Sequence, residues 1–160
     1  MDSITLAVGK DASGNIHHGH FGDADLFAQI TLLADGTLIP GPVVSNSSKS
    51  LDDTHGATGK MKSVLAALSP LHCVVSTRMS PNFKRMARES PIQPVVIRCA
   101  DDSQLLPCLS RECARLMEWV DRRQQDDPMP GVPVLEATPG PDSPPPDCKP
   151  LYPPKKWKHL

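Results

Sequence analysis

The distribution of proline along this chain of 160 residues limits where a folded core can form. Eleven of the 18 prolines lie in the last 33 residues, from Pro128 onward. A segment this rich in proline favours extended conformations and buries too little apolar surface to offset the entropy of ordering. We therefore expect one folded domain over residues 1–125 and a disordered, proline-rich tail over residues 126–160. A domain of this length can bury a modest core.

Hydrophobic patterning within the expected domain predicts five strands and three helices. Alternating or short continuous apolar runs predict strands at residues 4–8, 26–33, 37–44, 71–75 and 95–97. Apolar residues at helical spacing predict helices around residues 61–68, 81–87 and 106–120. Three strands followed by alternating helices and strands are typical of a mixed sheet with helices packed against it.

Local signals refine this prediction. The Asp35-Gly36 dipeptide is typical of a two-residue hairpin turn between the second and third strands. Pro40 and Pro42 lack amide donors, so we expect the third strand at an edge of the sheet. Ser80-Pro81 is typical of a helix N-cap followed by proline at the first helical position. Pro107 fits only in the first turn of the last helix.

Charge is divided between the two halves of the expected domain. Residues 1–55 contain seven acidic and two basic side chains, whereas residues 56–125 contain six acidic and eleven basic ones. These charges either attract each other weakly across one domain or create a positive field that attracts an anion. The basic residues that would create this field are Lys60, Lys62, Arg78, Lys84, Arg85 and Arg88. Nucleic-acid binding is disfavoured, because only 4% of residues are aromatic and base stacking needs aromatic side chains.

Composition argues for a cytoplasmic protein. No apolar run approaches the roughly 18 residues of a membrane span, and Met1-Asp2-Ser3 does not begin a secretory signal. The five cysteines are odd in number and widely spaced, so we expect no disulfide framework. Cys73 and Cys113 fall on apolar patterns and are expected to be core thiols. Cys108 and Cys113 are five residues apart, which turns a helix by about 140°, so they do not face one ligand.

Histidine is concentrated near the beginning of the chain. His17, His18 and His20 lie within four positions, beside Asp23 and Asp25. Neutral imidazole is a good ligand for transition metals, and this spacing allows two or three rings to converge. A polar surface turn with incidental histidines is the alternative. If the later strands run parallel to the first, loops 10–25, 45–57 and 76–82 meet at one edge of the sheet, where ligands bind in open α/β proteins.

The run His20-Phe21-Gly22-Asp23-Ala24-Asp25-Leu26-Phe27 follows a short strand and a Gly-Asn turn. It resembles the HFG-x-A-x-x-F signature of the NifX/NafY family of dinitrogenase iron–molybdenum cofactor biosynthesis domains. The resemblance extends over about residues 3–120 in the order of the elements. It implies a three-layer α/β/α fold of the ribonuclease-H-like type, with a five-stranded mixed sheet in the order 3-2-1-4-5. This chain has Thr77–Pro81 where many members have a glycine-rich loop, and the tail is not part of the family module.

The resemblance also implies a function without turnover, in which the protein binds, carries or inserts an iron–sulfur or iron–molybdenum–sulfur cluster. The histidine of the motif, here His20, is the implied cluster ligand. Further candidates for contact with the cluster are His17, His18, His55, Arg78 and Lys60, the last two as charges that balance an anionic cluster. The expected partners are cofactor-assembly or acceptor proteins, with no nucleic acid and no membrane; a transient homodimer sharing a cluster fits the same function.

Two other classes of function compete with this one. A metal-free regulatory or scaffold module would dock a partner ATPase or cofactor synthase through the basic end of the tail, Lys155–Leu160. Enzymatic function is disfavoured, because the paired carboxylates fall in expected loops rather than on central strands, as two-metal chemistry requires. No serine or cysteine has a convincing base partner for nucleophilic catalysis. The segment Gly56–Met61 is too short for a phosphate-binding loop and lacks the hydroxyl residue after its lysine.

Overall fold

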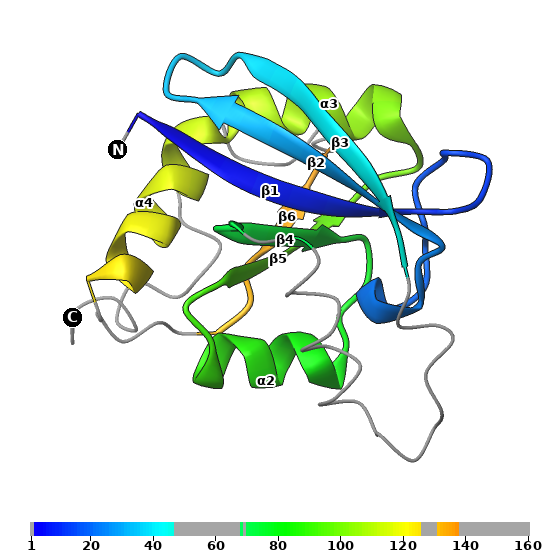
Figure 1. Cartoon of the computed structure of the whole chain (residues 1–160). Coiled ribbons are helices and arrows are strands. Elements are labelled where there is room, and N and C mark those ends of the chain that lie inside the picture. The colour runs from blue at the N-terminus through cyan, green and yellow to red at the C-terminus, as the bar shows by residue number, and fades with distance from the viewer. Residues whose placement is uncertain (1, 47–67, 69, 126–130, 138–160) are drawn as a thin grey trace.

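The computed structural model describes residues 2–46, 68, 70–125 and 131–137 of the chain (Figure 1). Six strands form one mixed sheet in the order β3-β2-β1-β4-β5-β6. These strands are β1 (Ser3–Lys10), β2 (Leu26–Leu33), β3 (Leu38–Ser45), β4 (Cys73–Ser76), β5 (Gln93–Arg98) and β6 (Val134–Glu136). The described helical elements are the short 3-10 turn η1 (Phe21–Asp23) and the helices α2 (Pro81–Glu89), α3 (Asp102–Arg111) and α4 (Cys113–Gln124).

The direction of the strands decides which loops meet. Strand β1 pairs antiparallel with β2, and β2 pairs antiparallel with β3. Strands β1, β4, β5 and β6 run parallel to one another. The carboxyl ends of β1, β3, β4, β5 and β6 therefore lie at the same edge of the sheet. We call this edge the strand-end rim.

Helices cover both faces of the sheet (Figure 1). Apolar side chains of α3 and α4 pack on one face against alternate residues of the strands, including Leu6, Val75 and Ile97. The other face packs against α2, with Ala7 and Val74 among the strand residues. Alternation along β1 and β4 places successive side chains in different cores, which is why these central strands are buried throughout most of their length.

The pair Leu33–Thr37 closes the hairpin between β2 and β3 around residues 34–36, so the turn has three residues rather than the two predicted. The amide of Leu33 donates to the Thr37 carbonyl at 2.9 Å, and the amide of Gly36 donates to the Leu33 carbonyl at 2.9 Å. Gly36 adopts φ 91°, the left-handed conformation that this longer turn requires. Strand β3 lies at an edge of the sheet, as Pro40 and Pro42 predict.

Helix α2 begins as its sequence predicts. The Ser80 hydroxyl accepts a hydrogen bond from the Phe83 amide at 3.2 Å, and Pro81 is the first helical residue. Phe83, Met86 and Ala87 are buried against the sheet.

The last predicted helix is divided into two helices. Helix α3 ends at Arg111 and α4 begins at Cys113, with Glu112 between them in a non-helical turn conformation. Pro107 lies beyond the first turn of α3, because this helix begins earlier than its apolar stripe indicates. Leu106, the first residue of the apolar pattern that predicted this helix, is 38% exposed.

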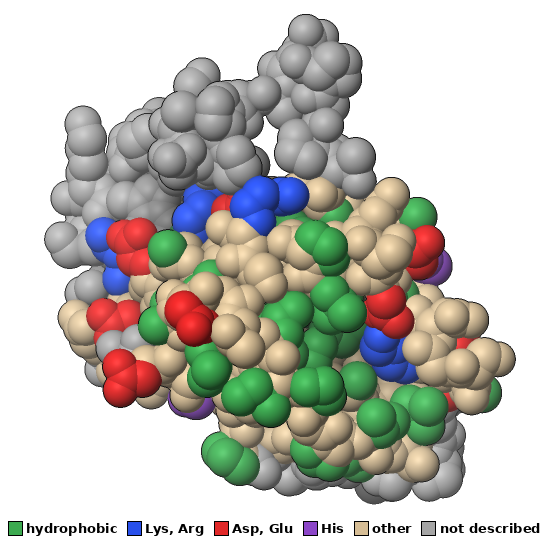
Figure 2. Space-filling model, turned by 90° about the horizontal axis from the view of Figure 1, so that it is seen from above, with side chains coloured by type: hydrophobic (Ala, Val, Ile, Leu, Met, Phe, Trp, Pro, Cys, Tyr) green, Lys and Arg blue, Asp and Glu red, His purple; other side chains and the backbone are tan. Residues whose placement is uncertain are grey.

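Hydrophobic side chains gather on the face of the molecule shown in Figure 2. Among the described residues, the large hydrophobic side chains that are exposed are Ile39 and Val43 of β3 and Leu106 of α3. None of the described helices is long and apolar enough to cross a membrane.

The sheet has six strands rather than the five expected, and the additional strand comes from the segment assigned to the tail. The Val96 amide donates to the Pro133 carbonyl at 2.9 Å, and the Ala137 amide donates to the Arg98 carbonyl at 3.0 Å. Leu135 is only 2% exposed. A short apolar alternation thus forms a strand despite its surrounding prolines, because β5 offers an open edge. The rest of the predicted tail lies outside the described residues.

Candidate functional site

Three loops that the structure describes in full follow strands that end at the strand-end rim. They are the loop after β1, which contains the histidine cluster, the β4–α2 connection at Thr77–Ser80, and the β5–α3 connection at Cys99–Asp101. The loop after β3 begins with Asn46, beyond which residues 47–67 are not described. The sequence predicts that the loops after the first and fourth strands meet at this edge, and the structure places both loops there. The β5–α3 connection lies beside them.

The loop after β1 is held by its own polar groups. The Asp11 carboxylate accepts from the amides of Ser13 and Asn15, each at 2.9 Å. The Asp25 carboxylate accepts from the Ala12 amide at 3.0 Å. Ile16 then returns to the sheet and is only 5% exposed. The loop is consequently an ordered platform for the three histidines that follow.

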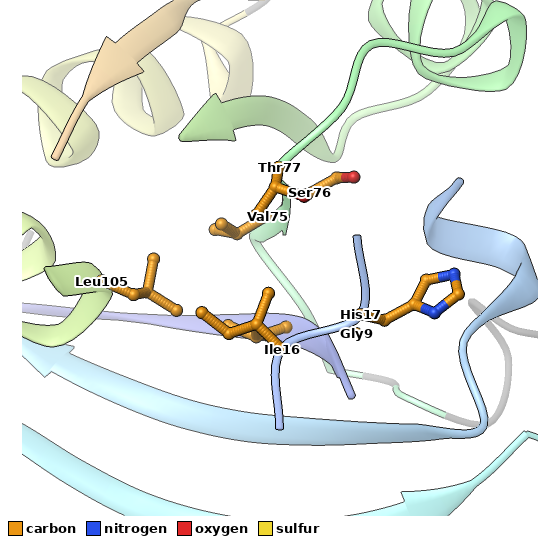
Figure 3. A pocket seen from close by; sticks show the side chains of 8 residues that line it. Gly9, Ile16, His17, Val75, Ser76, Thr77 and Leu105 are labelled. Carbon is orange, nitrogen blue, oxygen red and sulfur yellow. The ribbon is translucent and has the colours of Figure 1, made fainter. Parts of the chain in front are cut away.

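His17 carries a buried ring nitrogen. Its amide donates to the Gly9 carbonyl at 3.0 Å, and its Nε2 atom is buried without a hydrogen-bond partner in the described part of the chain. A Cβ atom at Gly19 would lie 2.7 Å from this Nε2 atom, so any larger residue there would displace the ring from this position. Figure 3 shows the ring extending away from Ile16, Val75 and Leu105.

A small cavity lies beneath the histidine loop. Its volume is about 10 Å³, and its lining includes Gly9, Ile16, Val75 and Ser76 (Figure 3). That volume is at the lower limit for a single water molecule. A guest larger than a water molecule does not fit inside this cavity.

His18 joins the three loops. Its Nδ1 atom lies 3.1 Å from the Thr77 hydroxyl, and its Nε2 atom lies 3.0 Å from the Ala100 carbonyl. Since a carbonyl only accepts hydrogen bonds, Nε2 is the protonated donor, and in the neutral ring Nδ1 accepts from Thr77. Both ring nitrogens are therefore engaged, and in this arrangement His18 connects loops rather than offering a free nitrogen.

His20 is exposed, and its neighbours fix its position. It precedes η1, and its carbonyl accepts from the Asp23 amide at 3.0 Å. The next residue, Phe21, is buried against Phe27 and Phe83, with ring centroids 4.9 Å and 5.8 Å away. Phe21 and Phe27 of the HFG motif thus form the anchor of the turn, while the His20 ring makes no hydrogen bond within the described residues.

Asn46 is a residue of the rim that the sequence did not single out. It is 9% exposed, and its side-chain amide donates to the carbonyls of Gly22 at 2.9 Å and Ala24 at 2.7 Å. It therefore joins the end of β3 to η1. Its only sequence signal was its position immediately after a strand.

Charged groups surround the rim. Arg78 is exposed beside Thr77, and its amide donates to the Ser76 hydroxyl at 3.2 Å. Lys10 forms an ion pair with Asp102 at the start of α3. Burial raises the pKa of the Cys99 thiol to about 11, and the carboxylates of Asp102 and Asp101 add to this increase. His55 and Lys60, the other predicted contacts, lie outside the described residues.

The histidines do not converge into a chelating set. No group of three or more His, Cys, Asp or Glu side chains in the described ranges is arranged to hold a metal ion. Among the described residues, the rim instead presents the exposed imidazole of His20, the buried Nε2 atom of His17 and the exposed guanidinium of Arg78.

No family model matches this sequence, and no curated protein matches it.

Proposed function

We propose that the chain is a non-catalytic carrier of a preassembled iron–sulfur or iron–molybdenum–sulfur cluster in metallocluster assembly or transfer. The cluster binds at the strand-end rim, with His20 as the protein ligand. The observation that carries this proposal is the exposed His20 ring, which makes no hydrogen bond with other described residues and extends from a backbone that the buried Phe21 anchors.

The form of the rim favours a cluster over a single ion. A lone zinc ion needs three or four converging protein ligands, and the described residues provide no such group. In a preassembled cluster, inorganic sulfide already supplies most of the coordination of each iron atom. One imidazole together with charge complementarity is then sufficient for a reversible contact, which is what transfer to an acceptor requires.

The other rim residues have supporting roles in this proposal. Arg78 and Lys60 balance the negative charge of the cluster, and His55 remains a further candidate for contact. The unpartnered Nε2 atom of His17 is available to the cluster if Gly19 shifts away. His18 positions the loop through Thr77 and Ala100.

The fold supports the same assignment. A mixed sheet with helices on both faces is compatible with the ribonuclease-H-like architecture that the HFG motif implies, with β6 as an addition to it. By this proposal the chain acts in the cytoplasm and exchanges its cargo with cofactor-assembly or acceptor proteins, without turnover of its own. Nitrogenase is one destination for such cargo.

Anaerobic reconstitution tests the proposal. Wild-type chain and the His20→Ala variant are incubated with iron–molybdenum–sulfur species, desalted, and analysed by absorbance and by metal content. We expect the wild type to retain iron and sulfide and His20→Ala to lose most of both. Asn15→Ala, a change at an exposed position on the same loop, is the matched control. Equal loading of the wild type and His20→Ala would remove the central assignment.

A metal-free scaffold is the second candidate, and one observation favours it. Strand β6 is parallel to β5, so Ala137 leaves the sheet at the strand-end rim. The basic segment Lys155–Leu160 follows from there in the sequence. A chain that ends after Ala137 distinguishes the candidates, because a carrier keeps its cluster whereas a docking module loses its partner ATPase or synthase.

A further inference from the structure

The outer edge of β5 holds a short segment of the chain much as a peptide-binding protein holds its ligand. Residues 131–137 follow a part of the chain that is not described, form the three-residue strand β6, and are followed by another such part. They lie in an extended conformation along β5, parallel to it (Figure 1). Adding an extended segment to a sheet edge is a common mode of peptide recognition.

Backbone groups hold both ends of this segment. The Val96 amide of β5 donates to the Pro133 carbonyl at 2.9 Å, and the Ala137 amide donates to the Arg98 carbonyl at 3.0 Å. Arg111 of α3 donates through Nη2 to the Glu136 carbonyl at 3.1 Å and through Nη1 and Nη2 to the Ala137 carbonyl, both at 3.3 Å. Its Nε atom lies 3.7 Å from the Glu112 carboxylate, which holds the guanidinium in place.

Side chains add selectivity to these backbone contacts. Leu135 is 2% exposed and packs in the core beneath α3 and α4, so this position accepts a large aliphatic side chain. Glu136 meets Arg98 at 3.0 Å on the surface, which favours an acidic residue there. Ala137 is 6% exposed and belongs to the same core cluster, which favours a small apolar residue there.

We propose that the β5 edge and Arg111 form a peptide-binding groove, which the chain's own residues 131–137 occupy as an exchangeable internal ligand. The external ligand is an extended segment of a partner protein with a large aliphatic residue, then an acidic residue, then a small one. It binds parallel to β5, with Arg111 capping its last two carbonyls. We call this site the β5 groove.

Competition explains how such a site is regulated. An internal segment on a short connection competes at a millimolar effective concentration. A partner therefore gains access only when it binds more tightly than residues 131–137 or when a second contact holds it nearby. The strand itself has three residues and lies at the edge of the sheet, so its opening breaks hydrogen bonds to one neighbouring strand only.

Peptide binding to the full chain tests the proposal. The probe is a fluorescent peptide with the sequence Gly-Val-Pro-Val-Leu-Glu-Ala, and binding is followed by anisotropy. We expect Leu135→Asp, which expels the internal segment, to bind the probe about tenfold more tightly than the wild type or better. Adding Arg111→Gln to that variant should abolish binding, whereas adding Arg122→Gln on α4, the matched control, should not. A probe with aspartate in place of leucine should fail to bind.

Hydrogen exchange of the wild-type chain tests the same groove without a substitution. We expect the Ala137 amide to exchange through a local opening, faster than the His72 amide, which donates to the Thr5 carbonyl between β1 and β4. Equal exchange of the two amides would overturn the proposal, as would equally weak probe binding by a folded Leu135→Asp variant. A wild-type dimer that Leu135→Asp abolishes would assign the groove to a second copy of the chain and overturn the proposal of a separate partner.

Discussion

At the scale of single residues, the rim is organised by side chains that bind backbone groups. Asn46 joins the end of β3 to η1, and His18 joins the histidine loop to the loops after β4 and β5. Asn46 satisfies two buried carbonyls that would otherwise lack a donor, whereas the contacts of His18 lie at the surface and tie loops together. Together with the buried Phe21, these two side chains hold the backbone from which the exposed His20 side chain extends.

Asn46→Ala should destabilise the chain by about 1–3 kcal/mol, because it leaves the carbonyls of Gly22 and Ala24 buried without their donor. Urea unfolding measures this loss. Asn15→Ala, at an exposed position of the histidine loop, is the control and should change the free energy of unfolding by less than about 0.5 kcal/mol. If Asn46→Ala changed the free energy of unfolding as little as the control does, the two hydrogen bonds would contribute little to stability.

Buried thiols should make the fold sensitive to alkali. Burial raises the pKa of Cys73 to about 12, with the nearby Arg123 partly opposing the increase. Burial is also the main cause that raises the pKa of Cys108 to about 11. Because an unfolded thiol ionises near its ordinary pKa of about 8.5, the stability that these neutral thiols contribute is fully present below that pH. It is lost progressively as the pH rises toward their folded pKa values.

Cys73→Ala separates this effect from other titrations. We expect the free energy of unfolding of the wild type to fall more steeply between pH 8.5 and 11 than that of Cys73→Ala, in chemical denaturation at each pH. The variant is expected to be less stable at pH 7 because it leaves a cavity, so the slope with pH is the quantity to compare. Parallel slopes would contradict the assigned cause.

At the scale of elements, two glycines with the same left-handed conformation differ in what packs against them. Gly36 in the β2–β3 turn and Gly14 in the histidine loop have φ angles of 91° and 87°. A Cβ atom at Gly36 would lie 3.2 Å from the Ser110 carbonyl oxygen, whereas one at Gly14 would meet nothing within 4 Å. The Ser110 hydroxyl also donates to the Gly36 carbonyl at 2.7 Å. The hairpin turn is therefore part of the contact with α3.

Gly36→Ala and Gly14→Ala form a matched pair. Both substitutions strain a left-handed backbone, which costs about 1 kcal/mol or more. Gly36→Ala also presses against α3, so it should lower the melting temperature further than Gly14→Ala. Thermal unfolding followed by circular dichroism measures both variants. Equal losses would mean that α3 shifts freely to admit the added methyl group.

At the scale of the whole molecule, the sheet is completed by a strand from beyond the expected domain. Strand β6 covers the edge of β5 and places Leu135 in the core with α3 and α4. The folded unit consequently extends to Ala137 among the described residues. A domain boundary placed by proline content alone would exclude this strand.

Two truncations test that extension. A chain ending after Asp127 should be less stable than a chain ending after Ala137, because burial of a leucine side chain contributes about 1.5–3 kcal/mol. The chain that ends after Ala137 should have the same free energy of unfolding as the full chain in urea. Equal stability of the two truncated chains would show that β6 adds nothing to the fold.

Several features could be predicted because they depend on neighbouring residues. The Ser80 hydroxyl caps the helix that Pro81 begins, and the alternation in Ser3–Lys10 specifies a strand. Pro40 and Pro42 exclude β3 from the centre of a sheet because they lack amide donors. The break at Glu112 was missed, because the apolar residues of α3 and α4 continue at helical spacing across it.

The sequence by itself determined the local elements, the edge position of β3 and the clustering of histidines in one loop, since these follow from backbone chemistry and the spacing of side chains. Only the tertiary structure decided that His18 would meet Thr77 and Ala100, 59 and 82 residues away. It also decided that residues 131–137 would complete the sheet. These contacts depend on how whole elements pack. The residues of a short segment do not indicate which distant strand edge or carbonyl group will be accessible to it.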